Sequence, residues 1–114
     1  MKKWKGSVIE ESLDDNRIIN NLKIIKLKIT NDKKPKDRWH IYYVLISKNQ
    51  IKNIQAHLKN KWYAHFWSRD KIIVLFKSKK FILNAKNKAT WVDAIKYGIS
   101  IGIPEEQLDF LIEF

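Results

Sequence analysis

The side chains best suited to chemistry in this sequence stand at alternate positions of two aromatic runs. Residues 62–67 place Tyr63, His65 and Trp67 on one side of an extended chain. Residues 39–46 contain His40 and Tyr42, two positions apart. Imidazole exchanges a proton near neutral pH, while tyrosine and tryptophan combine an apolar ring with a hydrogen-bonding group. These five residues are the candidates for a binding face.

Two histidines alone do not predict catalysis. A general acid–base site usually needs an orienting carboxylate or a nucleophile beside the imidazole. Asp70 lies in the turn after the second run and Glu10 ends the first expected strand, but no spacing brings either one to a histidine. A small enzyme or ligand-binding protein that uses His40 and His65 is therefore kept as an alternative.

Motifs for metals, cofactors and phosphates are absent from the sequence. A catalytic zinc or iron site would need two histidines and a carboxylate at a ligand spacing, and His57 is expected at the edge of a buried helix stripe. With three glycines and no cysteine, the chain has no glycine-rich phosphate loop and no thiol nucleophile. We expect no metal and no cofactor.

Composition indicates a soluble protein. The absence of cysteine fits a reducing cytoplasm, and no segment reaches the roughly 20 apolar residues of a membrane span. We therefore expect a cytoplasmic protein that does not contact a membrane.

The net charge of +11 raises the alternative of single-stranded nucleic acid as a partner. Only Arg17, Arg38 and Arg69 among the 23 basic residues are arginine, the residue favoured for bidentate phosphate contacts. The chain is also rich in isoleucine and asparagine, as AT-rich codon usage would produce. The charge by itself supports this alternative only weakly.

Six segments have the composition and alternation of strands. They cover residues 4–10, 23–30, 39–46, 62–67, 72–76 and 81–83. In the second segment Ile25, Leu27 and Ile29 alternate with polar residues, which predicts one buried and one exposed face. The third segment is apolar at both parities, which predicts a central strand.

Helix signals fall in three places. Ser47 and Gln50 form a capping-box pattern, and Thr90 with Asp93 repeats it before a second helix. Pro104 opens a short final helix. The order of elements predicts a single α+β domain over residues 1–114, in which one antiparallel-dominated sheet of about five or six strands has helices packed on one face.

Helices on one face would leave the other face of the sheet open. We expect Trp62, Ala64 and Phe66 to belong to the core. The more polar residues of both runs would then share the open face, and these are His40, Tyr42, Tyr63, His65 and Trp67. Such aromatic residues also stabilise sheets without any ligand. The leading hypothesis is a binding or homo-oligomeric interaction module, such as a homodimer, that uses this face.

Three blocks of the sequence are distinctive: WHIYYVLIS at 39–47, WYAHFW at 62–67 and GIPEEQLDF at 102–110. Together they resemble small prokaryotic proteins to which no function is assigned. The resemblance extends from Gly6 to Phe110. It implies a compact single domain and assigns no catalytic residue.

Overall fold

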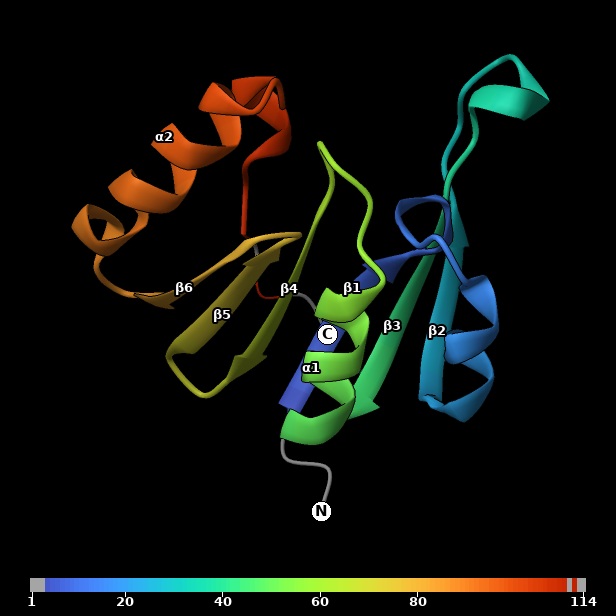
Figure 1. Cartoon of the computed structure of the whole chain (residues 1–114), viewed down its shortest axis with the longest axis horizontal. Helices are drawn as coiled ribbons and strands as arrows, with labels where there is room; N and C mark the ends of the chain where they lie inside the picture. Colours follow the sequence, from blue (N-terminus) through green and yellow to red (C-terminus); the bar gives the residue numbers. More distant parts are fainter. Residues whose placement is uncertain (1–3, 111, 113–114) are drawn as a thin grey trace.

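The fold is built on one antiparallel sheet of six strands in the order β2-β3-β1-β4-β5-β6 (Figure 1). The computed structural model describes residues 4–110 and 112. Its strands are β1 Trp4–Ile9, β2 Lys23–Ile29, β3 His40–Ile46, β4 Tyr63–Ser68, β5 Lys71–Phe76 and β6 Lys79–Asn84. The predicted α+β class and the single antiparallel sheet are confirmed.

Two α-helices and several 3-10 turns connect the strands. The α-helices are α1 Lys48–Ala56 and α2 Val92–Ser100. The 3-10 turns are η1 Glu10–Ser12, η2 Asn16–Asn21, η3 Pro35–Asp37, η4 Lys88–Trp91 and η5 Glu105–Gln107. None of the described helices has the length and apolar character needed to cross a membrane.

The helices lie on both faces of the sheet, so the prediction that they pack on one face is wrong. On one face, Ile51 and Ile54 of α1 share a core cluster with Phe66. On the other, Ala94 of α2 shares a second cluster with Val74 and other residues of β4–β6. The physical reason is visible in β5, which is buried at both parities and needs cover on both sides. We call the two sides of the sheet the α1 face and the α2 face.

The capping signals gave one correct and one incorrect helix start. Ser47 and Gln50 form both halves of the capping box at α1. Thr90 does not cap α2, because its hydroxyl donates to the carbonyl of Asn87 at 2.7 Å and accepts from the N–H of Asn84 at 2.9 Å. The 3-10 turn η4, capped by the Asn87 side chain, leads into α2 instead. The helix expected after Pro104 is the 3-10 turn η5.

Strand β2 differs most from its prediction. All seven of its residues are exposed, including Ile25, Leu27 and Ile29, which were expected to be buried. β2 lies at an edge of the sheet, and the α1 core cluster begins at β3. Alternation in the sequence shows neither the β-bulge, which places Ile24 on the side of Leu27 and Ile29, nor whether any element covers the strand.

Candidate functional site

The register of the sheet divides the five predicted binding residues between the two faces. Ser7 of β1 lies opposite Tyr43 of β3 and opposite His65 of β4, so these three side chains share the α2 face. His40 and Tyr42 have the other parity of β3 and lie on the α1 face. The prediction of one shared face is therefore wrong. The strand between the two aromatic runs, β1, fixes their relative register, and the sequence of either run does not contain that information.

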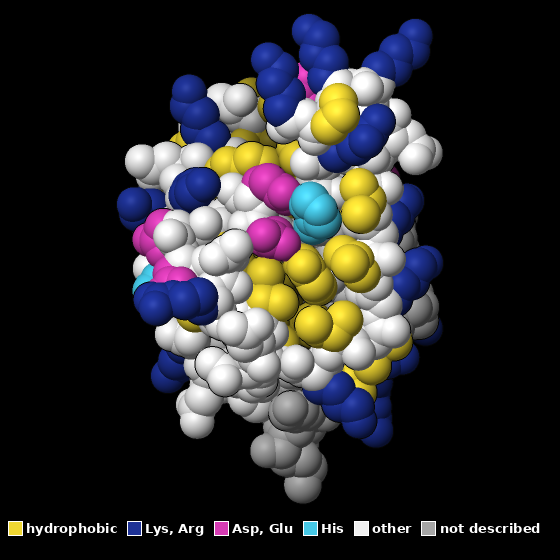
Figure 2. All heavy atoms as spheres, turned by 90° about the vertical axis from the view of Figure 1, so that its right-hand side faces the viewer, with side chains coloured by type: hydrophobic (Ala, Val, Ile, Leu, Met, Phe, Trp, Pro, Cys, Tyr) yellow, Lys and Arg dark blue, Asp and Glu magenta, His cyan; other side chains and the backbone are white. Residues whose placement is uncertain are grey.

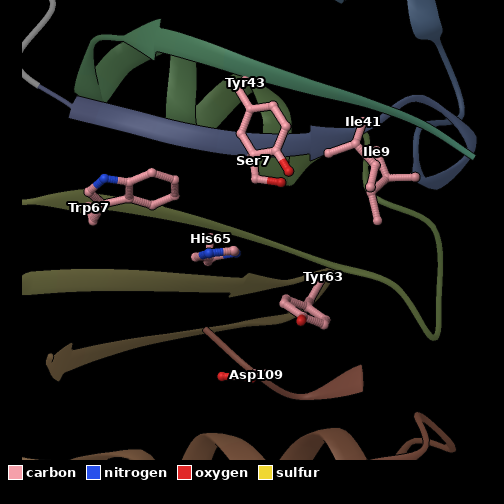
Figure 3. A pocket seen from close by; sticks show the side chains of 8 residues that line it. All are labelled: Ser7, Ile9, Ile41, Tyr43, Tyr63, His65, Trp67 and Asp109. Carbon is pink, nitrogen blue, oxygen red and sulfur yellow. The ribbon is translucent and has the colours of Figure 1, made fainter. Parts of the chain in front are cut away.

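Tyr63, His65 and Trp67 do come together, in a cavity of about 180 Å³ on the α2 face (Figure 3). We call this cavity the aromatic groove. Its lining residues are Ser7, Ile9, Ile41, Tyr43, Tyr63, His65, Trp67 and Asp109. The groove lies at the boundary of the part of the sheet that α2 and the C-terminal segment cover. The core cluster on the α2 face includes residues of β4, β5 and β6 but none of β1 or β3. The step between the covered and uncovered halves of the sheet forms the recess.

One wall of the groove is a row of rings along β4. The ring centroids of Tyr63 and His65 are 6.3 Å apart, and those of His65 and Trp67 are 5.2 Å apart. Phe110 lies beside this row, with its ring centroid 5.4 Å from that of Tyr63. Trp67 is only 3% exposed, because it also belongs to the α2 cluster. It was expected on an open surface and is instead a buried wall.

Tyr63 fixes the C-terminal segment against the sheet. Its hydroxyl donates a hydrogen bond to the backbone carbonyl of Gln107. Burial, together with the nearby negative charge of Asp109, raises the pKa of Tyr63 to about 12. The phenol therefore stays neutral and acts as a structural hydrogen-bond donor.

Charge differs along the groove. Lys5 lies opposite Trp67 in the β1–β4 ladder, and the Lys26 Nζ lies 5.5 Å from the centre of the Tyr43 ring. Asp109 lines the end beside Tyr63. Lys5 therefore lies at the Trp67 end of the groove, Lys26 lies beside its middle, and the carboxylate-bearing Asp109 lies near its Tyr63 end.

A separate polar cluster forms around His40 on the α1 face. The two carboxylate oxygens of Glu11 accept from the His40 backbone N–H at 2.9 Å and pair with its Nδ1 at 2.8 Å. This hydrogen bond raises the pKa of His40. Burial alone would raise the pKa of Glu11, but the hydrogen bonds from His40 outweigh it and lower that pKa.

Glu10 holds the neighbouring tyrosine in the same cluster. The Tyr42 hydroxyl donates to Glu10 Oε1 at 3.0 Å. Burial and this hydrogen bond raise the pKa of Tyr42. Sequence reasoning missed the pairing of Glu11 with His40, because 29 positions separate them and only the fold brings them together.

The three histidines do not converge. His40 and His65 lie on opposite faces of the sheet, so they do not form the two-histidine site of the enzyme alternative. His57 ends α1, where its Nδ1 lies 2.8 Å from Asp14 Oδ1. Over residues 4–110 and 112, no three histidine, cysteine or acidic side chains group in a way that could hold a metal ion.

The groove also contains residues that sequence reasoning did not place there. Ile41 and Tyr43 were not among the five residues expected on the open face, and Ser7 and Ile9 were not singled out at all. No local signal in β1 marks Ser7 as a groove residue, because its place depends on pairing with strands that are distant in sequence. Only the row along β4 was predictable.

Comparisons with known proteins give no relative: no family model, curated protein or solved structure matches this chain. The function must therefore be argued from the geometry alone.

Proposed function

We propose that the protein is a binding module whose aromatic groove receives a planar aromatic group. The observation that carries the proposal is that Tyr63, His65 and Trp67 line one cavity together with Tyr43. Aromatic walls favour a flat ring through stacked and edge-to-face contacts. Sites for drug-sized ligands measure about 300–1,000 Å³. A groove of about 180 Å³ suits a single ring system.

The recess favours such a ligand over a homodimer on the same face. A self-associating surface presents exposed apolar side chains to its copy. Trp67 and Tyr43 are only 3% and 6% exposed. They offer little area to a flat partner surface, and a ligand in the groove would contact chiefly the half-buried rings of Tyr63 and His65.

The test uses three compounds that share one ring and differ in charge: indole, indole-3-acetate and tryptamine. Titrations followed by amide NMR should move the signals of residues 5–9, 41–43 and 63–67. Indole-3-acetate should bind most tightly, because Lys5 and Lys26 lie near the groove. If none of the three compounds moved these signals, the proposal would be wrong.

A matched pair of variants locates the binding. Ser7→Leu places a larger side chain in the lining of the groove and should abolish the shifts. Ser100→Leu makes the same change at an exposed position of α2 and should leave them unaltered. Equal loss of binding in both variants would show that the compounds bind elsewhere.

Single-stranded nucleic acid is a second candidate, favoured by the lysines that share the α2 face with the groove. Lys26 lies opposite Tyr43 and Lys28 opposite Ile41, so both project on that side. Aromatic side chains that stack a base, with lysines for the phosphates, are the usual means of binding single strands. Binding of a fluorescent oligothymidylate should weaken steeply between about 50 and 200 mM salt. If no binding occurred even at low salt, this candidate would be removed.

The cytoplasm is the location that we propose. The support is the cysteine-free sequence, which fits a reducing compartment. Fractionation of cells that make the protein from its own gene would test it.

A further inference from the structure

Strand β2 presents an unusual amount of apolar surface at the edge of the sheet. Ile24, Ile25, Leu27 and Ile29 are between 45% and 50% exposed. Figure 2 looks onto this side of the molecule and shows hydrophobic side chains gathered in a patch, with acidic side chains and a histidine along its upper edge and lysine and arginine side chains below it and farther out. A contiguous exposed patch of this kind is typical of an interaction surface.

The backbone of β2 is also available for pairing. Within the part of the chain that the structure describes, β2 pairs with β3 alone. Its outward N–H and C=O groups can therefore accept one more strand. β2 is seven residues long, enough to support an added strand of ordinary length.

The two sides of β2 differ in chemistry. Ile24, Leu27 and Ile29 lie opposite Val44, Tyr42 and His40, on the α1 face. Lys23, Lys26 and Lys28 lie opposite Leu45, Tyr43 and Ile41, on the α2 face. A β-bulge between Ile24 and Lys26 places Ile24 and Leu27 on the same side of the strand. An added strand would thus meet aliphatic side chains at one parity and ammonium groups at the other.

We propose that β2 is a docking edge for an extended acidic segment of another protein, which adds as a seventh strand. The segment alternates apolar residues, which pack beside Leu27, with Asp or Glu, which face the lysines. Backbone pairing gives such strand addition its affinity, and the alternating side chains give it specificity. The proposal shares Lys26 with the aromatic groove, but it rests on the exposed edge of β2 and not on any ligand of that groove.

Charge decides between this partner and a second copy of the chain. Two copies paired through β2 would bring their lysines together on one face, and like charges on neighbouring strands are destabilising. Each copy also carries a net charge of +11. Lysines on an edge strand discourage pairing between identical chains, but they attract an acidic strand.

The probe is a capped peptide of alternating Val and Glu, about six residues long. In NMR titrations with the full chain, it should shift the amide signals of residues 23–29 and slow their hydrogen exchange. An alternating Val-Lys peptide of equal length should bind at least about tenfold more weakly.

Variants at the two edges of the sheet provide the control. Leu27→Glu, at a position 47% exposed, should weaken the Val-Glu peptide by about tenfold or more without unfolding the protein. Ile82→Glu makes the same kind of change on the other edge strand, at a position 58% exposed, and should leave binding unchanged. The double variant Lys26→Glu, Lys28→Glu should prefer the Val-Lys peptide.

Three results would overturn the proposal. In the first, the Val-Glu peptide causes no shift in β2. In the second, both peptides bind equally in the wild-type chain, which would remove the role of the lysines. In the third, light scattering finds a dimer that Leu27→Glu dissociates, which would make a second copy the occupant of the edge.

Discussion

At the scale of single residues, His40 and Glu11 form a polar pair that the fold assembles and that carries a pH dependence. Both carboxylate oxygens of Glu11 bind His40, the first residue of β3. The pair therefore anchors the start of β3 to the turn that follows β1. Its place beside the exposed aliphatic residues of β2 makes it a structural support for that edge.

The His40–Glu11 pair should stabilise the fold most in mildly acidic solution. The pKa of His40 is raised from 6.5, so its contribution to the free energy of unfolding is complete below that value and is lost as the pH rises through the folded-state pKa. The pKa of Glu11 is lowered from 4.5, so its contribution is complete above that value and is lost as the pH falls through the folded-state pKa. Urea unfolding should therefore show a larger stability loss for His40→Asn at about pH 5.5 than at about pH 8.5.

The control for this prediction is Glu11→Gln, which removes the charge that His40 meets. In that background, the difference between the costs of His40→Asn at the two pH values should be clearly smaller, and the charge of Glu10 accounts for what remains. A pH-independent effect of His40→Asn in the wild-type background would contradict the assigned pair.

At the scale of elements, the central strand β1 sets the geometry of both faces. It pairs with β3 on one side and β4 on the other, and so fixes Tyr43 beside the row of rings on β4. Its approach to β4 depends on Gly6. A Cβ built at that position would lie 2.1 Å from Phe66 Cδ1, well inside van der Waals contact.

Gly6→Ala should therefore destabilise the fold by about 1–3 kcal/mol, the usual cost of overpacking a core. The Phe66 ring is fully buried and has little room to move. Urea denaturation measures the change. Ser7→Ala is the neighbouring control and should have a much smaller effect, because it removes atoms from the lining of the groove and adds none to the core. Equal stability of Gly6→Ala and wild type would show that Phe66 rearranges freely.

At the scale of the whole molecule, the chain builds two cores on opposite sides of one sheet. The α1 core spans β3, β1, β4 and β5, and the α2 core spans β4, β5 and β6. The C-terminal segment completes the α2 core, since Phe110 is fully buried and Leu108 is 4% exposed. The uncovered remainder of the sheet supplies both proposed sites, the aromatic groove and the β2 edge.

Phe110→Ala tests how far the C-terminal segment supports the molecule. The ring contacts Tyr63 and Trp91, with centroids 5.4 Å away in each case. Its removal should lower the free energy of unfolding by about 3–5 kcal/mol. Ile112→Ala, at a position 42% exposed, should change stability by no more than about 0.5 kcal/mol. A small effect of Phe110→Ala in urea unfolding would mean that the α2 core is stable without this segment.

Local pattern predicted much of the fold but only part of the site. The six strand segments, the capping box at Ser47 and the shared parity of Tyr63, His65 and Trp67 follow from periods of two and from side-chain hydrogen bonding within a few residues. The continuous apolar run of β5 also indicated that both faces of the sheet are covered, but the prediction of helices on one face did not take it into account. Parity is local, so the sequence could place three groove residues together.

The sequence by itself determined the α+β class, the aromatic row on β4 and the basic character of the chain. Only the tertiary structure decided that His40 and Tyr42 lie on the opposite face, that Tyr43 and Ser7 complete the groove, and that Leu27 lies on an uncovered edge. The physical reason is that strand order and register arise from contacts between segments far apart in the chain. The order and register of the strands decide which side chains of neighbouring strands share a face, and no local pattern of residues records them.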